Sequence, residues 1–179
     1  MSKLLKYARV ERERRFLLAG LPPELDPGRG FQRFSDLYLA GTRLRLREVR
    51  APDGEVIERK LNQKLPAPDG ASGHRISTSV YLDAAEYALL AALPGRRLEK
   101  RRHPYAWGGH AFGIDVFAGP LTGLVLAEVE LEAEAELAAL PVPPFARCEV
   151  TALPFFTGGA LAQENPARVL AEARRLLSG

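Results

Sequence analysis

Residues 42–65 read TRLRLREVRAPDGEVIERKLNQKL, two alternating runs of charged and apolar residues that flank the turn sequence Pro52-Asp53-Gly54. Alternation with a period of two places successive side chains on opposite faces of a β-strand, and Pro-Asp-Gly is strong turn chemistry. The stretch therefore predicts a β-hairpin with strands over residues 42–49 and 56–65. One face of this hairpin is apolar, and the other carries rows of basic side chains.

The rest of the chain shows the same strand period between turn residues. Further strands are predicted over residues 9–18, 75–82, 97–102, 111–117, 124–132 and 148–151. Helices are predicted over residues 84–93, 132–140 and 165–178, the first and last with Asp83 and Asn165 as N-caps. About eight strands joined by many turns favour a barrel or a highly curved sheet with short flanking helices. We expect one α+β domain over residues 1–179, with its core at about 9–163.

Composition narrows the class of protein. The chain has 179 residues, 46% hydrophobic and 26% charged, which is typical of a globular protein. Its single cysteine, Cys148, excludes an internal disulfide and a cysteine-based zinc site, and it suits a reducing compartment. Residues 1–15 lack the apolar core of a secretion signal, and no uncharged apolar run is long enough to span a membrane. We therefore expect a cytoplasmic protein with no membrane partner.

Charged residues are sorted by sign along the predicted strands, as in Arg43-Leu-Arg-Leu-Arg47 and Glu128-Val-Glu130. An ordinary solvated sheet face is the plain explanation for any one such strand, but like charges side by side are destabilising. The bases on the shared faces are Arg15, Arg45, Arg47, Lys60, Lys64, Arg75, Lys100 and Arg102, and the acids are Glu11, Glu13, Asp115, Glu128 and Glu130. Carboxylates hold hard cations such as Mg²⁺, and arginines and lysines hold phosphate oxygens. The rows together predict a metal–polyphosphate site. The net charge of +3 agrees with an anionic partner, whereas acids interleaved among the bases argue against nucleic acid.

Several segments, in order, resemble the CYTH domain, or triphosphate tunnel metalloenzyme, superfamily. The first is Glu11-Arg-Glu-Arg-Arg15, which matches that family's ExExK strand with arginine in the lysine position. The others are Asp36-Leu-Tyr-Leu39, Leu44-Arg-Leu-Arg47, Lys64, Leu98-Glu-Lys-Arg-Arg102, Ile114-Asp-Val-Phe-Ala-Gly119, Gly123-Leu-Val-Leu-Ala-Glu-Val-Glu-Leu131 and Cys148-Glu-Val-Thr151. The resemblance covers roughly residues 10–163.

This resemblance implies an eight-stranded antiparallel β-barrel that forms a tunnel around a triphosphate, with Mg²⁺ or Mn²⁺ as cofactor. By position, Glu11, Glu13, Glu128 and Glu130 match the catalytic, metal-binding carboxylates, with Asp115 beside them as a further metal ligand. The phosphate-binding positions fall on Arg15, Arg45, Arg47, Lys64, Lys100 and Arg102, and Arg75 is expected to join them. The implied activity is metal-dependent hydrolysis of a small-molecule triphosphate, inorganic triphosphate first.

The sequence departs from the family pattern at Ser77 and Ser79, where bacterial relatives often carry two glutamates. Serine brings no charge, so a second metal and activation of the attacking water are in question. The alternatives are therefore a non-catalytic or weakly catalytic binder of polyphosphate or nucleoside triphosphate, a class IV adenylate cyclase, a thiamine triphosphatase and an RNA 5′-triphosphatase. We also allow for a homodimer, and we expect the three histidines on the surface and Gly158-Gly159 in a turn.

Overall fold

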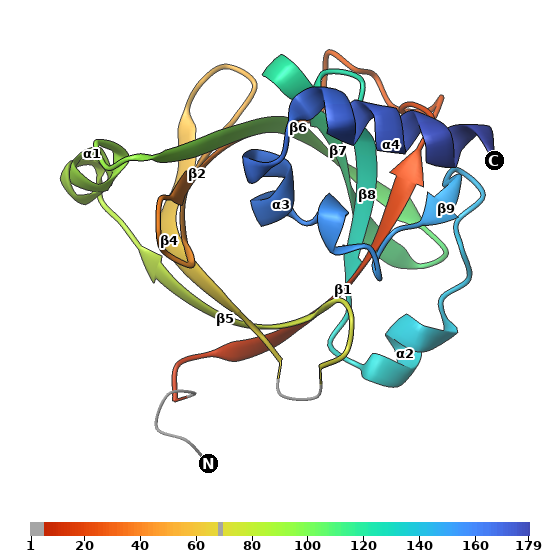
Figure 1. Ribbon diagram of the computed structural model, residues 1–179, viewed down its shortest axis with the longest axis horizontal. Helices are drawn as coiled ribbons and strands as arrows, with labels where there is room; N and C mark the ends of the chain where they lie inside the picture. The colour runs from red at the N-terminus through yellow and green to blue at the C-terminus, as the bar shows by residue number, and fades with distance from the viewer. Residues whose placement is uncertain (1–5, 68–69) are drawn as a thin grey trace.

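Eight antiparallel strands close into a barrel in the computed structural model, which describes residues 6–67 and 70–179 (Figure 1). The strands follow the order β5-β4-β3-β2-β6-β7-β8-β1 around the barrel, and β1 pairs with β5 to complete the ring. Their bounds are β1 Arg9–Leu18, β2 Gln32–Leu39, β3 Leu44–Arg50, β4 Val56–Pro66, β5 His74–Tyr81, β6 Gly95–Trp107, β7 His110–Phe117 and β8 Val125–Glu130. The predicted fold class, an α+β protein built on an eight-stranded antiparallel barrel with a few short helices, is confirmed.

The identity of the eight strands differs from the sequence prediction at two places. Strand β2 was not predicted, because its inward side carries Phe34, Asp36 and Tyr38 and its outward side mixes polar and apolar residues. The predicted strand over residues 148–151 shortens to β9, Cys148–Glu149, which pairs with β1 at Phe16 and Leu17 outside the ring. The barrel therefore gains β2, and β9 is a ninth strand.

Gly73 allows β1 to change partners part-way along its length. Residues 9–12 of β1 pair with β5, and residues 13–18 pair with β8. At the junction the Glu13 N–H donates to the Gly73 carbonyl at 3.1 Å, and a Cβ on Gly73 would lie 2.2 Å from the Glu13 carbonyl oxygen. Gly73 also has φ +82°, a left-handed conformation that glycine adopts without strain. This close approach of the two backbones closes the barrel beside Glu11 and Glu13, whose side chains line the cavity.

Helices cover the outside of the barrel and one of its ends. Helix α1, Ala84–Ala91, begins with the predicted Asp83–Glu86 capping box and packs on β3 and β4. Helix α4, Pro166–Ser178, is capped by Asn165 as predicted, and α2 spans Glu134–Ala139. The remaining elements are the 3₁₀ turns η2, Gly119–Leu121, and η3, Pro154–Phe156, and helix α3, Gly158–Gln163.

Helix α3 corrects the prediction that Gly158 and Gly159 form a turn. The Thr157 hydroxyl accepts from the Ala160 N–H, and this cap lets both glycines start a helix. A Cβ on Gly158 would lie 2.2 Å from the Tyr38 hydroxyl oxygen, so only glycine lets α3 come this close to β2. As a result α3 lies over part of the barrel opening (Figure 1), with Leu161 buried in the main core.

Two of the three histidines are buried, contrary to the prediction. His74 is 6% exposed and His103 is 1% exposed, and the His103 ring packs 5.5 Å from the ring of Phe31. His103 lies on β6, which extends five residues beyond its predicted end and passes under the chain that leads into β2. Among the described helices, none is long and apolar enough to cross a membrane.

Candidate functional site: a charged tunnel

The barrel encloses a cavity of about 1420 Å³ that is lined by residues from all eight strands. Eleven basic and six acidic side chains of the described residues line it, so the interior carries an excess of positive charge. The bases are Arg9, Arg15, Arg43, Arg45, Arg47, Lys60, Lys64, Arg75, Arg96, Lys100 and Arg102, and the acids are Glu11, Glu13, Asp36, Glu58, Glu128 and Glu130. Such an interior suits a small polyanion, because a narrow charged cavity concentrates its field on an ion of the opposite sign.

Carboxylates crowd together where β1 meets β8. Glu13 stands directly opposite Glu130 in the β1–β8 register, and Glu11 lies two residues away on the same face. Burial raises the pKa of the Glu130 carboxyl, and the charge of Glu11 raises it further. Like charges opposite one another are destabilising, so a cation bound between these carboxylates would reduce their repulsion.

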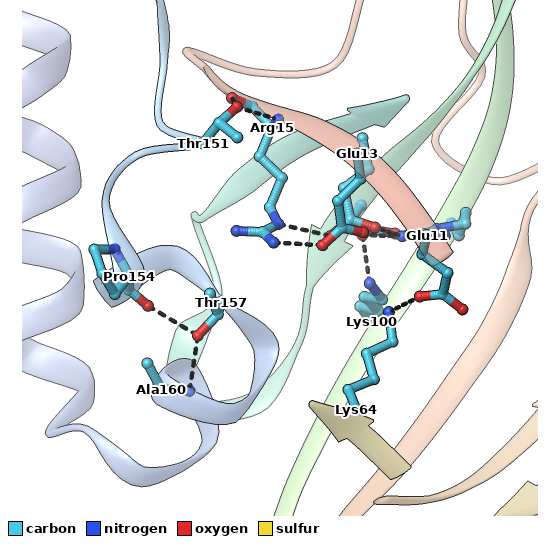
Figure 2. A network of polar contacts seen from close by, with 12 residues as sticks. Glu11, Glu13, Arg15, Lys64, Lys100, Thr151, Pro154, Thr157 and Ala160 are labelled. Atoms are coloured by element: carbon cyan, nitrogen blue, oxygen red, sulfur yellow. Dashed lines mark hydrogen bonds and ion pairs between the residues drawn. The ribbon is translucent and has the colours of Figure 1, made fainter. Parts of the chain in front are cut away.

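Each of these carboxylates engages a basic side chain. Figure 2 shows two of the pairs: Lys64 Nζ lies 2.5 Å from Glu11 Oε2, and Arg15 donates to Glu13. Burial tends to raise the pKa of Glu11, but the charge and the hydrogen bond of Lys64, together with smaller contributions from neighbouring side chains, lower it. The more exposed Arg9 reaches Glu130 at 2.7 Å. These three pairs hold the acids and bases of the site in one alternating network.

A second network joins β6, β7 and β8. Arg102 donates to both oxygens of Asp115, at 2.6 and 2.5 Å, and to Glu128, while Lys100 donates to Asp115. Burial tends to raise the pKa of Glu128, but the charges of Lys100 and Arg102 lower it to well below its ordinary value. A Cβ on Gly113 would lie 2.9 Å from Arg102 Cδ and Nε, so the missing side chain gives the guanidinium its place against β7.

A third network, on β2 and β3, includes a residue that the sequence analysis left without a role. Asp36 is 2% exposed and accepts two hydrogen bonds from Arg47, at 2.6 and 2.7 Å, while Arg45 Nη1 lies 3.8 Å away. Burial would raise the pKa of Asp36, but Arg47 and then Arg45 lower it to about 2. Beside them, burial and then the charge of Asp36 raise the pKa of Tyr38 to about 12. Phe34, Asp36 and Tyr38 lie two residues apart, so they share one face of β2. This spacing could have identified Asp36 in the sequence as a cavity-facing residue.

Two buried arginine nitrogens in the tunnel, Arg45 Nε and Arg15 Nη1, have no hydrogen-bond partner among residues 6–67 and 70–179. A buried donor without an acceptor is costly, and a guanidinium nitrogen most readily finds one on a phosphate or carboxylate. Arg75 also lines the cavity, and it donates a hydrogen bond to the carbonyl of neighbouring His74 at 2.7 Å. The tunnel therefore offers donors to an anionic ligand.

The structure brings together almost all of the predicted site residues. The cavity is lined by Glu11, Glu13, Arg15, Arg45, Arg47, Lys64, Arg75, Lys100, Arg102, Glu128 and Glu130, from six of the eight strands. Asp115 is the exception, because it is fully buried behind the cavity wall and its oxygens are engaged by Lys100 and Arg102. Its role as a metal ligand stays a prediction.

Known proteins share both this sequence and this architecture. An inorganic triphosphatase of Nitrosomonas europaea is 32% identical over 166 residues, which span 88% of this chain and 99% of that protein. The chain belongs to the CYTH, or triphosphate tunnel metalloenzyme, superfamily. A solved inorganic triphosphatase structure superposes with a TM-score of 0.57 at 27% identity, over 86% of this chain and 95% of its own. A Bacillus halodurans protein provisionally assigned as an adenylate cyclase shares the fold, with a TM-score of 0.50 at 16% identity over 74% of this chain and 86% of its own. No protein-family model matches the sequence.

The tunnel carboxylates of this superfamily member fit a divalent cation in charge and in donor atom. Glu11, Glu13 and Glu130 offer only oxygen ligands, which hard cations such as Mg²⁺ and Mn²⁺ prefer. Burial and then the charge of Glu11 raise the pKa of Glu130, and a bound cation would favour the ionised form of this carboxyl. Across the described part of the chain, however, no three His, Cys, Asp or Glu residues converge tightly enough to form a ready metal site. In this structure these glutamates form ion pairs with basic side chains rather than with a cation.

Proposed function

We propose that this protein hydrolyses inorganic triphosphate inside the barrel, with a divalent cation as cofactor. The observation that carries this proposal is the cavity inside the closed ring of strands, whose lining combines an excess of bases with glutamates that face one another across β1 and β8. The similarity to an inorganic triphosphatase along nearly that protein's whole length supports the same substrate. Linear triphosphate is small and densely charged, and it needs no pocket for a base or sugar.

In this proposal the basic side chains bind and orient the phosphate chain. Arg45 and Arg47 approach it from β3, and Lys100 and Arg102 approach it from β6. Arginine presents a planar fork of donors that matches phosphate oxygens, and it keeps its charge when buried. The negative charge that builds on the departing phosphate would be stabilised by these groups, which the folded barrel has already placed. Arg15, Lys64 and Arg75 complete the proposed phosphate contacts.

We assign the cation to the carboxylates Glu11, Glu13, Glu128 and Glu130, and we keep Asp115 as a candidate fifth ligand. When bound, Mg²⁺ or Mn²⁺ would supply a Lewis acid for phosphate oxygens and would acidify a water molecule. The protein's own contribution is to hold both charge types in one register. Bases such as Lys64 and Arg15, which now neutralise these acids, would turn to the phosphates once substrate enters.

The test is phosphate release from the purified protein, with inorganic triphosphate, ATP, thiamine triphosphate and pyrophosphate as substrates. Each is supplied with Mg²⁺, with Mn²⁺ and with EDTA. We expect metal-dependent release, fastest from inorganic triphosphate. Glu11→Ala should abolish turnover, whereas Arg45→Ala should mainly raise KM. If no substrate releases phosphate while triphosphate still raises the Tm of the protein, hydrolysis is contradicted and a non-catalytic binder is favoured. Release that persists in EDTA would contradict the cofactor.

The remaining sequence predictions concern partners and location. They are a cytoplasmic protein without a nucleic-acid partner, and a homodimer as one arrangement. The inward-facing acids and bases of the tunnel argue against a nucleic-acid partner, because they do not form an open basic surface. Native mass spectrometry would measure the oligomeric state directly.

A further inference from the structure

A chain of hydrogen bonds crosses three neighbouring strands next to the phosphate-binding arginines. Arg45 Nη2 donates to Asn62 Oδ1 at 2.8 Å, and Asn62 Nδ2 donates to Ser79 Oγ at 2.5 Å. The three residues form one row of the sheet, because Arg45 is paired with Asn62 and Asn62 with Ser79 in the strand register. All three side chains line the cavity, and Asn62 is only 3% exposed. We call this row the Arg45–Asn62–Ser79 relay.

The chemistry of the relay allows one orientation of the amide. Guanidinium nitrogens only donate, so Arg45 requires the carbonyl oxygen of Asn62. The Asn62 NH₂ group must then find an acceptor on its other side, and the Ser79 hydroxyl supplies it. Without that acceptor, the NH₂ group of the buried amide would lose its hydrogen bond, which destabilises this rotamer of Asn62. Ser79 therefore controls how Asn62 faces Arg45.

The relay holds Arg45 without neutralising it, unlike the other buried arginines of the tunnel. Arg47 is held by both oxygens of Asp36, and Arg102 by Asp115 and Glu128. Arg45 has a neutral amide at 2.8 Å, while the Asp36 carboxylate lies 3.8 Å from it. Its Nε stays buried in the tunnel with no partner among the described residues.

We propose that Asn62 and Ser79 are positioning residues that orient Arg45 toward a substrate phosphate without adding a negative charge, so that Asp36, which Arg47 already occupies, compensates the Arg45 charge only in part. A neutral holder fixes the side chain before substrate arrives, so less rotamer freedom is lost on binding. A carboxylate holder would do the same but would cancel most of the charge that attracts the phosphate. This proposal rests on the proposed function, since it concerns the same triphosphate.

The experiment compares Ser79→Ala, Ser79→Thr and Asn62→Asp for inorganic triphosphate turnover, and for Kd by calorimetry. Ser79→Ala removes one neutral hydrogen bond and should raise Kd and KM about two- to tenfold, with kcat changed less than twofold. Ser79→Thr keeps the hydroxyl and should restore values near those of the wild type. Asn62→Asp preserves shape but pairs Arg45 with a charge, so Kd and KM should rise about tenfold or more.

Gln63→Ala and Thr78→Ala are the matched controls. They face one another on the same two strands, one residue along from the relay, and neither lines the cavity. Both should keep the wild-type KM and Kd, and Tm of every variant shows that the barrel is folded. If the controls raise Kd as much as Ser79→Ala, or if Asn62→Asp binds triphosphate as the wild type does, the positioning role is wrong.

The two proposals fail separately. A wild type that binds triphosphate without releasing phosphate overturns the hydrolase, yet the order of Kd values still confirms or contradicts the relay. A wild type that hydrolyses triphosphate, with Ser79→Ala and Ser79→Thr equally impaired, overturns the relay and keeps the hydrolase.

Discussion

Replacing Asp36 by asparagine removes the carboxylate that holds Arg47 inside the barrel. Asparagine has nearly the same shape as aspartate, but it carries no charge. The guanidinium of Arg47 would therefore stay buried beside a neutral amide. Asp36 and Arg47 are 2% and 8% exposed, so water does little to compensate for the lost charge. We therefore expect this single substitution to be among the most destabilising in the tunnel.

The structure sets the size of the effect. A pKa lowered from 3.8 to about 2 means that ionised Asp36 stabilises the folded protein by about 2 kcal/mol at neutral pH. Leaving one partner of a buried pair uncompensated costs about 3–5 kcal/mol. For a chain of this size, a loss of about 3 kcal/mol lowers Tm by about 6–12 °C.

The stabilisation also has a defined pH window. Because the folded-state pKa of Asp36 lies below the unfolded value, its contribution is fully present above about pH 4 and is lost as pH falls through about 2. The difference in stability between the wild type and Asp36→Asn should therefore shrink as pH falls from 4 to 2. Other carboxylates titrate in both proteins, and they cancel in this difference.

Urea unfolding followed by circular dichroism measures both quantities. Glu99→Gln is the matched control, because Glu99 is exposed on the outer face of β6 and its side chain makes no hydrogen bond or ion pair with the described residues. We expect this variant to unfold within about 0.5 kcal/mol of the wild type. An Asp36→Asn variant as stable as this control at pH 7 would refute the reasoning, as would a stability difference that does not change with pH.

Two further substitutions test the neighbouring networks. Glu130→Gln removes one of the neighbouring carboxylates Glu11, Glu13 and Glu130, so we expect the free energy of unfolding of the metal-free protein, measured in urea, to rise by up to about 1 kcal/mol. Metal-dependent phosphate release should fall at least about a hundredfold. A variant that is less stable and still active would contradict the repulsion between these carboxylates. Gly113→Ala places a Cβ 2.9 Å from Arg102 Nε, so the guanidinium should be displaced from Asp115. The KM for triphosphate should then rise about tenfold, which corresponds to the loss of one charge-assisted hydrogen bond. An unchanged KM would contradict this displacement.

Much of the barrel could be predicted from the sequence because strand period is a local property. The hairpin of residues 42–65 and the strands that carry Glu11 and Glu128 alternate plainly, and their turns contain Gly, Pro and Asp. Strand β2 was not predicted, because its inward face contains both Phe34 and Asp36 and polar and apolar residues therefore do not alternate along it. Its outer face is also mixed, since Leu37 and Leu39 pack in a hydrophobic cluster that includes residues of α1, whereas Arg33 is exposed.

The sequence by itself determined which side chains share a strand face, because the pleat sends every second residue the same way. It also determined that the inner faces carry far more charge than an ordinary core. Only the tertiary structure decided which acid meets which base, since Asp36 with Arg47, or Glu11 with Lys64, depends on strand register and on barrel closure at Gly73. Those contacts join residues on different strands, and the pattern within one strand does not encode which residue of another strand lies opposite.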